Sequence, residues 1–241
     1  MRRVDGPEIL DSDACSGSEA QAALAVIGRV NRWFGGVSTT QKMIERAAQV
    51  SRATRFSILE VGAGPGELPE IVRQRLSRRG ITLDVTLLDR AQSHLPHRNG
   101  SGSPTPQSHH IVADALALPF GAGSFDLVSC CLFAHHLDTA QLAQFVQEAV
   151  RVSRRAVLIN DLVRHPLHLS LAYAGYPLML NRVAWLDGLT SVRRAYLPEE
   201  IRRVIVSALP AMESAQVEIS RHYLFRMGAM VWKRPGDRSA I

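Results

Sequence analysis

Three glycines at every second position form the first pattern in this sequence that could do chemistry. Gly62, Gly64 and Gly66 directly follow an apolar run over residues 56–61 that contains one acid, Glu60. Glycine lets a backbone turn sharply and lets a ligand come close to it. Apolar residues at helical spacing follow the glycines, so the pattern predicts a buried parallel strand, a tight turn and the start of a helix. We expect a ligand to bind at this turn.

The residues between and after the glycines indicate which kind of ligand. A dinucleotide fold requires G-x-G-x-x-G, and its third glycine would stand where this sequence has Glu67. Pro65 removes one backbone N–H from the loop, although a pyrophosphate needs such donors. The charge of Glu67 is favourable at a helix N-terminus but unfavourable beside a pyrophosphate. The loop therefore favours a ligand without a phosphate group.

Acids also end the next two predicted strands. Residues 81–88 form an apolar run that ends at Asp89, and the short run 110–113 ends at Asp114. In open α/β sheets, ligands bind beyond the carboxyl ends of the strands. A carboxylate at the end of the second strand can accept hydrogen bonds from both hydroxyls of a ribose. The alternative is that Asp89 only caps a turn.

The pattern E-x-G-x-G-x-G, with Glu60 two residues before the first glycine, resembles motif I of the class I S-adenosylmethionine-dependent methyltransferases. The resemblance covers residues 56–232. It implies an α/β fold: a Rossmann-like, seven-stranded, mostly parallel sheet with helices on both faces and an antiparallel last strand. It also implies S-adenosylmethionine as cofactor, with Asp114 accepting from the adenine amino group. The residues we expect to bind the cofactor are Glu60, Gly62, Ala63, Gly64, Gly66, Asp89, Arg90, Asp114, Ala115 and Cys131.

A finer resemblance concerns the methyl acceptor. Phe125-Asp126 and residues 132–137, 151–155 and 160–164 are similar to a bacterial group of small-molecule methyltransferases near the quinone-biosynthesis type. Some relatives are associated with phenolic polyketide lipids, which implies a small, apolar, phenolic or quinol-type acceptor methylated at oxygen or carbon. Enzymes that methylate the amines of nucleic-acid bases carry a Pro-Pro-aromatic motif after strand four. Cys131-Leu-Phe-Ala stands there instead, so we expect no nucleic-acid partner.

Two histidines directly follow the predicted fourth strand, residues 124–131. Because a phenol has a pKa of about 10, a proton acceptor within reach would assist methyl transfer. His136 or His135 is the candidate catalytic base, since histidine accepts protons near neutral pH. The alternative is that one of the pair only packs or caps the next helix. For contact with the acceptor the candidates are Asp161, Arg164, His165 and Tyr173, with a local salt bridge as their alternative role.

The sequence gives no sign of a metal site. Magnesium-dependent catechol methyltransferases have an Asp after strand four and an Asp-Asn pair after strand five. Here the first position is Cys131, and the pair is reversed as Asn160-Asp161. The three cysteines also lack the spacing of a zinc site. We therefore expect no metal.

The length of 241 residues suits one α/β domain with additions. We expect a flexible tail over residues 1–18, a helical lid over 19–53 and the methyltransferase domain over 54–235, with a flexible loop at 91–108. The alternative for the lid is a pair of helices packed on the sheet edge.

An apolar insertion over residues 162–197 is the candidate acceptor cap. Prolines interrupt it, which predicts two short helices and then a turn at Asp187-Gly188. The alternative is a packing appendage or a dimer face, and the sequence leaves the oligomeric state open.

The formal net charge is +6, and the excess arginines are scattered along the chain. Solvated helix surface explains them best; contact with nucleic acid or with an anionic membrane surface is the alternative. No apolar run is long enough to span a bilayer, and the start is not a signal peptide, so we expect a cytoplasmic protein. Other functions to test are a nucleotide-dependent oxidoreductase, an RNA or protein methyltransferase, and a non-catalytic, cofactor-binding regulatory domain.

Overall fold

A seven-stranded sheet forms the centre of the computed structural model, which describes residues 1–4, 6–11, 17–95, 109–209 and 216–233. Its strands lie in the order β3-β2-β1-β4-β5-β7-β6. The strands are β1 (Arg55–Val61), β2 (Thr82–Asp89), β3 (His109–Val112), β4 (Phe125–Cys131), β5 (Ser153–Leu162), β6 (Gln216–His222) and β7 (Arg226–Trp232). β7 is antiparallel to both of its neighbours, and the other pairs are parallel. The predicted fold class is confirmed.

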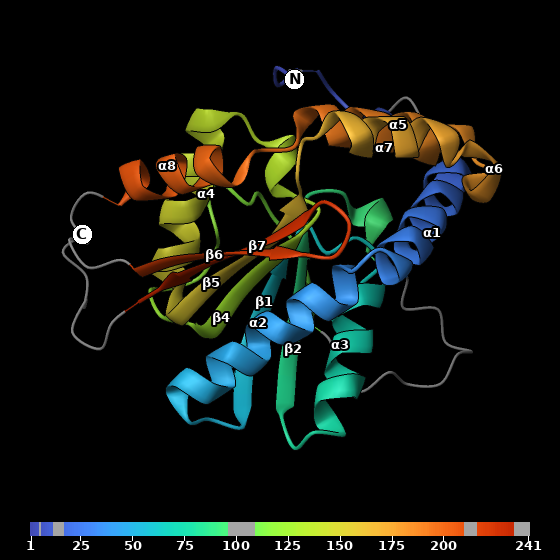
Figure 1. Cartoon of the computed structure of the whole chain (residues 1–241). Helices are drawn as coiled ribbons and strands as arrows, with labels where there is room; N and C mark the ends of the chain where they lie inside the picture. The colour runs from blue at the N-terminus through green and yellow to red at the C-terminus, as the bar shows by residue number, and fades with distance from the viewer. Residues whose placement is uncertain (5, 12–16, 96–108, 210–215, 234–241) are drawn as a thin grey trace, which may run out of the picture.

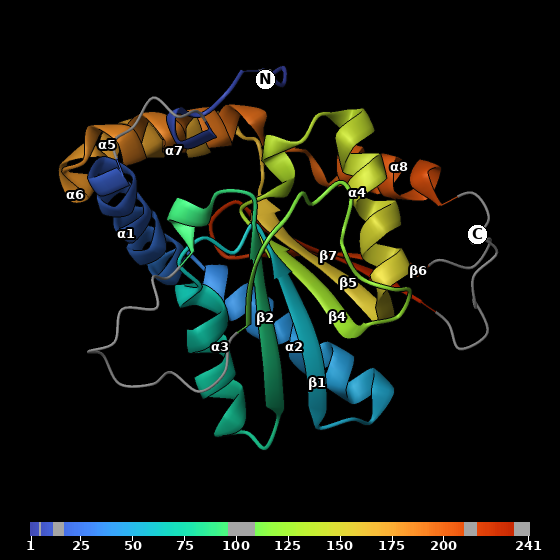
Figure 2. The same cartoon turned by 180° about the vertical axis from the view of Figure 1, so that it is seen from behind.

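Helices cover both faces of the sheet (Figures 1 and 2). The helices α2 (Gly36–Ser51) and α3 (Glu67–Ser77) lie on one face, and α4 (Thr139–Val152) and α8 (Pro198–Ala208) lie on the other. Alternate residues of β1 are buried against opposite faces: Phe56 and Ile58 belong to one core cluster, Leu59 and Val61 to another. A parallel strand covered on both sides is apolar throughout, which is why the run before the glycines carries only one acid.

β5 is longer than the sequence predicts. The apolar pattern indicates residues 155–160, whereas the strand runs from Ser153 to Leu162. Asp161 and Leu162 stay in the sheet because they pair with Met227 and Arg226 of the antiparallel β7. Asp161 is thereby a buried strand residue and not a residue of the following loop.

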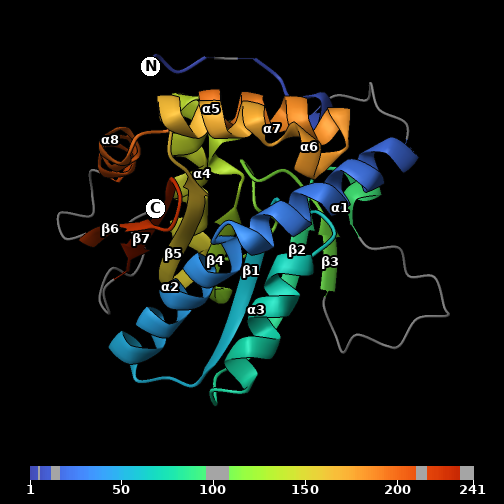
Figure 3. The same ribbon diagram turned by 45° about the vertical axis from the view of Figure 1, so that its right-hand side comes forward.

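Above the carboxyl ends of the parallel strands lie α1 (Gly17–Trp33) and the insertion, which forms α5 (Pro166–Ala174), α6 (Tyr176–Met179) and α7 (Arg182–Arg194). Figure 3 shows α1 crossing below these helices, and Ala23 and Val26 of α1 pack with Ala184 of α7. The insertion therefore has three helices where the sequence predicts two. The predicted turn at Asp187-Gly188 is wrong, because α7 continues through both residues.

The described residues of the expected tail lie against these helices. Asp187 of α7 accepts hydrogen bonds from the backbone N–H groups of Ile9 and Leu10, at 2.7 and 3.0 Å. Arg3 donates to the carbonyl oxygen of Arg194 at 2.6 Å. Glu8 is only 6% exposed. These polar contacts order a segment whose composition suggests a flexible tail; residues 5 and 12–16 lie outside the described part.

Two other expectations concern the loop and the membrane. Of the predicted flexible loop 91–108, residues Gln92–His94 form a short 3-10 helix, η2, while 96–108 lie outside the described residues. Among the helices that the structure describes, none is long and apolar enough to cross a membrane.

Candidate active site

The glycine turn lies between β1 and α3 and opens on a cavity. Its shape is held by backbone hydrogen bonds, from Ala63 N to Leu88 O at 3.1 Å and from Gly66 N to Ala63 O at 3.0 Å. Gly64 has φ of +52°, and a Cβ added there would meet no atom within 4 Å. Gly64 therefore faces open space, where a ligand can approach its backbone.

The other two glycines serve packing. A Cβ on Gly62 would come within 2.6 Å of the Phe133 ring, and one on Gly66 within 2.4 Å of Leu87. Gly62 still lines the cavity, whereas Gly66 does not. The three-glycine pattern thus combines one position open to a ligand with two positions where backbone and side chains meet closely.

Glu60 is buried beneath the turn and also lines the cavity. Burial raises the pKa of this carboxyl to about 7, although Ser129 beside it acts to lower it. Its Oε2 atom has no hydrogen-bond partner among the described residues. An acid in this condition is the one carboxylate of the turn that is free to accept a hydrogen bond from a ligand.

Asp89 ends β2 and holds the turn. Its Oδ2 accepts from Gly64 N at 2.9 Å, and its Oδ1 accepts from Ala91 N at 3.0 Å. Burial acts to raise the pKa of Asp89, but His94 and these two backbone N–H groups lower it below its ordinary value. Asp89 is therefore a carboxylate at the cavity wall, as the sequence predicts, and it also fixes the glycine loop.

The remaining predicted cofactor residues surround the same space. Arg90, Asp114, Ala115 and Cys131 line the cavity. Asp114 is exposed and accepts from Leu116 N at 2.9 Å. Cys131 accepts a hydrogen bond from Asn31 of α1 at 3.5 Å, and burial raises the pKa of its thiol to about 11, so the thiol stays protonated at neutral pH.

The cavity has a volume of about 1920 Å³ and extends from the glycine turn to the insertion helices. A site for one small ligand is usually about 300–1,000 Å³, so this cavity has room for a cofactor and an acceptor together. His135 and His136 line it, as do apolar residues of several elements. The apolar lining residues include Leu10, Ile27, Phe133, Leu171, Met179 and Phe225.

The two histidines form the short 3-10 helix η3 (Ala134–His136) after β4. His135 is 1% exposed, and its Nδ1 lies 2.7 Å from Asp161 Oδ1. The backbone N–H of His135 donates to Asp161 Oδ2 at 2.9 Å. Burial acts to lower the pKa of His135, but the charges of Asp161 and Glu8 raise it. The charge of His135 in turn lowers the pKa of Asp161 against the effect of burial.

His136 has a second carboxylate partner. Its Nδ1 lies 2.9 Å from Asp11 Oδ1, and its ring is stacked on Phe133 with 6.4 Å between centroids. Its side chain is 22% exposed, against 2% for His135. Burial acts to raise the pKa of Asp11, but His136 and Arg194 lower it to about 2.

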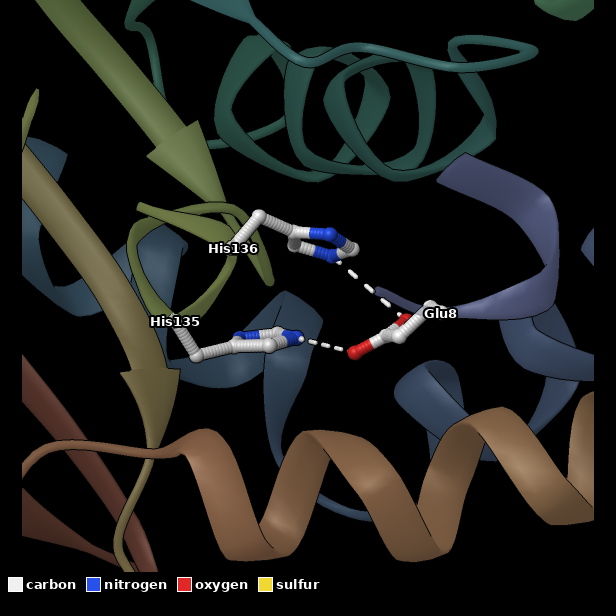
Figure 4. Close-up of side chains that lie close together, drawn as sticks. All are labelled: Glu8, His135 and His136. Atoms are coloured by element: carbon white, nitrogen blue, oxygen red, sulfur yellow. Dashed lines mark ion pairs between the residues drawn. The ribbon is translucent and has the colours of Figure 1, made fainter. Parts of the chain in front are cut away.

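Glu8 lies between the two imidazoles (Figure 4). Its Oε1 is 3.4 Å from His135 Nε2, and its Oε2 is 3.6 Å from His136 Nε2. Burial acts to raise the pKa of Glu8, but His135, and then His136 and Ser191, lower it. The sequence around Glu8 contains no motif that would predict a functional role. Its place beside the histidines follows from the contacts of the N-terminal segment with α7.

The structure gives the four predicted acceptor-binding residues other positions, since none of them lines the cavity. Asp161 holds His135. Arg164 is buried and donates to Glu200 at 2.7 Å and to the carbonyl of Ala195 at 2.6 Å. His165 caps α5 by accepting from Leu167 N at 3.1 Å. Tyr173 is 46% exposed. The insertion instead directs His168, Leu171 and Met179 to the cavity.

Arg226 is a further cavity residue that the sequence reasoning missed. It is 2% exposed and donates to Asn160 Oδ1 at 3.0 Å and to the carbonyl of Phe34 at 3.1 Å. Asn160 also donates to the carbonyl of Gly36 at 2.8 Å, which ties the start of α2 to the sheet. The one sequence signal was the charge of Arg226 at the start of an otherwise apolar strand.

Comparison with known proteins agrees with this geometry. Residues 58–156 match the family model described as a methyltransferase domain. That range contains the glycine turn, Asp89, Asp114 and the histidine pair. No curated protein sequence matches the chain.

Several solved structures share the fold. The plantazolicin methyltransferase BpumL, in complex with a monoazolic desmethylPZN analog and SAH, is 14% identical with a TM-score of 0.65, over 90% of this chain and 96% of that one. The plantazolicin methyltransferase BamL, with a triazolic analog and SAH, is 10% identical with a TM-score of 0.67, over 89% and 90%. Human N-acetylserotonin methyltransferase, with SAM, is 13% identical with a TM-score of 0.60, over 89% and 56%.

At such low identities the solved structures establish the fold alone, and the domain match adds the kind of chemistry. The domain match agrees with the predicted class of enzyme, a methyltransferase, and S-adenosylmethionine stays the predicted cofactor. These comparisons leave the chemical identity of the methyl acceptor open.

Proposed function

We propose that this protein transfers the methyl group of S-adenosylmethionine to a small, apolar acceptor that carries a phenolic or quinol hydroxyl, at that oxygen or at a ring carbon activated by it. The observation that carries the proposal is that the glycine turn and the histidine pair line the same cavity. Its volume suits two ligands side by side, and apolar residues line the part beneath the insertion.

The cofactor binds at the glycine turn in this proposal. Glu60, Gly62, Ala63, Gly64, Asp89, Arg90, Asp114, Ala115 and Cys131 line that end of the cavity. Gly64 presents its backbone to the ligand, and Asp89 and Asp114 present carboxylates at the ends of β2 and β3. Gly66 acts through the shape of the turn, because its Cα faces Leu87.

The acceptor binds beyond the cofactor, with its hydroxyl directed to His136 and His135. The sulfonium already makes the methyl group electrophilic, so the protein has to align the nucleophile and exclude water. A group that removes the hydroxyl proton raises the nucleophilicity of the oxygen. His136 is the more accessible of the pair and lines the cavity; its Nδ1 is held by Asp11, and its Nε2 lies 3.6 Å from Glu8 Oε2.

Protein-wide charge argues against a nucleic-acid acceptor. A basic stripe beside the cavity would favour RNA, but several of the arginines are paired with acids elsewhere. Arg151 contacts Glu148, and Arg154 and Arg155 contact Asp126. The positive charge is therefore dispersed and partly neutralised.

The test is methyl transfer itself. The purified protein is incubated with methyl-labelled S-adenosylmethionine and a panel of apolar phenols and quinols, with structured RNA and peptides as the comparison panel. We expect label in at least one phenolic product, and mass spectrometry and NMR of that product distinguish oxygen from carbon. Transfer only to RNA or peptide would contradict the proposal, and binding of the cofactor without transfer to any panel would favour a regulatory domain.

A further inference from the structure

The three side chains in Figure 4 have the composition and spacing of a metal site. Glu8, His135 and His136 each offer a ligand atom, and these atoms all lie within 4.8 Å of one another. Glu8 Oε1 is 3.4 Å from His135 Nε2, and Glu8 Oε2 is 3.6 Å from His136 Nε2. Ligand atoms about 2.0–2.1 Å from a tetrahedral Zn²⁺ are separated by roughly 3.3 Å. The cluster therefore needs little movement to surround a cation.

Both imidazoles are oriented as metal ligands usually are. A histidine that binds a metal through one ring nitrogen typically donates the other N–H to a carboxylate, which fixes the tautomer and the ring. His135 Nδ1 is held by Asp161 at 2.7 Å, and His136 Nδ1 by Asp11 at 2.9 Å. In each ring the nitrogen that remains is Nε2, and both Nε2 atoms face Glu8.

One buried atom of the cluster has no hydrogen-bond partner. His135 Nε2 is buried and has no hydrogen-bond partner in the part of the chain that the structure describes. Buried polar atoms are nearly always satisfied by a partner, a water or an ion. Glu8 is too far for a hydrogen bond at 3.4 Å but suitably placed as a second ligand of a shared cation.

The carboxylates around the two histidines attract positive charge, either as a proton on an imidazole or as a bound cation. Three carboxylates, those of Glu8, Asp11 and Asp161, contact the two imidazoles. Arg194 pairs with Asp11 at 3.3 Å and donates to the backbone carbonyl groups of both histidines. With neutral imidazoles, the cluster keeps an excess of negative charge that a divalent cation offsets. A proton on an imidazole competes with the cation for the same place, so cation binding releases protons.

We propose that Glu8, His135 and His136 bind a divalent cation of the zinc type, with Asp161 and Asp11 orienting the two histidines. Imidazole nitrogen is a poor ligand for Mg²⁺ and a good one for Zn²⁺, Co²⁺ and Fe²⁺. Two histidines and one glutamate leave a fourth position open, as in catalytic zinc sites. All three ligands line the cavity, so the open position is directed toward its contents.

The cation gives the histidine pair a specific role in methyl transfer, a step that rests on the proposed function. A cation held by these residues would supply positive charge beside the acceptor hydroxyl and so would lower its pKa, as it does for bound water. In this arrangement the two imidazoles act through the cation and do not accept the proton themselves, so the hydroxyl proton leaves to solvent. The oxygen then forms a bond to the methyl carbon while the carbon–sulfur bond breaks, and the sulfonium leaves as a neutral thioether.

Cation binding is measured on the full-length protein after treatment with a chelator and removal of the chelator. Titration with Co²⁺ should give the visible absorption of a four-coordinate site, and calorimetry with Zn²⁺ should give one cation per chain. Glu8→Gln keeps the size of the side chain and should weaken binding by at least about tenfold, and Asp11→Asn by about 10–100-fold.

Glu218→Gln is the matched control, because Glu218 lies on β6 and pairs with Arg46 at the surface. It should bind the cation like the wild type. Circular dichroism and thermal melting of each variant show whether it is folded. Absence of binding by the folded wild type, or equal binding by the Glu8→Gln and Glu218→Gln proteins, would overturn the metal site.

The two proposals fail in different ways. If phenols are methylated at full rate in the presence of chelator and the wild type binds no cation, the metal site is wrong and the proposed function stands. If one cation binds through Glu8 but no hydroxyl compound is methylated, the site stands and the acceptor assignment is wrong. If chelation abolishes methylation of the phenol and Zn²⁺ restores it, while cofactor affinity is unchanged, both are supported.

Discussion

The two ends of the cavity are assembled in different ways. At the cofactor end, Glu60 and Gly64 lie in β1 and in the loop after it, and Asp89 ends the next strand, β2. The carboxylate of Asp89 accepts from Gly64 N and from Ala91 N. At the acceptor end, Glu8, His135 and Asp161 come from the N-terminal segment, η3 and β5, and they meet only because the chain folds.

The acids at the two ends of the cavity differ in whether they have cationic partners. Glu60 is a buried acid without a cationic partner among the described residues, and burial raises its pKa. The acids of the acceptor end contact imidazoles or guanidinium groups, which lower the pKa of Asp11, Asp161 and Glu8. The cofactor end thus combines a shaped backbone with separate acids, Glu60, Asp89 and Asp114, while the acceptor end is a dense cluster of paired charges. Changes at one end should leave the other intact.

The largest effect is expected from Gly64→Val. The position has φ of +52° and opens on the cavity, so a branched side chain would be strained and would occupy the space of the ligand. We expect binding of SAH, measured by calorimetry, to be lost while the protein remains folded and the histidine cluster remains intact.

Gly80→Val is the matched control, since Gly80 has φ of +78° and equally open space but lies in the turn between α3 and β2. It should carry a similar strain and keep full affinity for SAH. Equal loss of binding in both variants would mean that strain, and not the place of Gly64 at the ligand, is the cause.

The acceptor end is tested by His136→Ala. Loss of this imidazole should lower kcat by about 10²–10⁴-fold, because the hydroxyl proton is no longer removed efficiently, whereas affinity for SAH should change little. Steady-state kinetics on a phenolic acceptor and calorimetry with SAH measure the two quantities. His109→Ala, at an exposed position of β3, is the control. Full turnover by His136→Ala would show that catalysis proceeds by alignment alone.

The smallest effect concerns stability and the charge of Glu60. A group whose pKa is raised on folding, here from 4.5 to about 7, binds its proton more tightly in the folded state. Its contribution to stability is complete below pH 4.5 and is lost as the pH rises to about 7. Glu60→Gln should therefore raise the free energy of unfolding by about 3 kcal/mol at pH 8, and by nothing measurable near pH 4.

Denaturant unfolding without cofactor, at both pH values, measures this difference. Glu67→Gln is the control in the same loop, because that side chain is 43% exposed. If Glu60→Gln raised the free energy of unfolding equally at both pH values, ionisation of Glu60 would not be the cause. The proposed difference between the unpaired acid Glu60 and the paired acids of the acceptor end would then be wrong.

The sequence predicted the fold, and it named most of the residues that line the cavity around the glycine turn, because both depend on local patterns. The alternation of apolar residues on β1 and the glycines after it are contiguous, and Asp89 and Asp114 mark the ends of the next two strands. The predictions were wrong where residues distant in the sequence decide the structure. Pairing with β7 extends β5 through Asp161. Asp187 lies inside α7, where it accepts a hydrogen bond from the N-terminal backbone, and not in a turn.

The sequence by itself determined the class of the protein, because a strand, a turn and a helix start are encoded by neighbouring residues whose φ preferences and hydrophobicity act over short range. It also placed two histidines at the carboxyl end of β4. Only the tertiary structure decided what surrounds them. Glu8 and Asp11 lie in a polar segment without a motif. Their position follows from hydrogen bonds between this segment and α7, and from ion pairs of the two carboxylates with His136. Such contacts join residues far apart along the chain, so no local pattern records them.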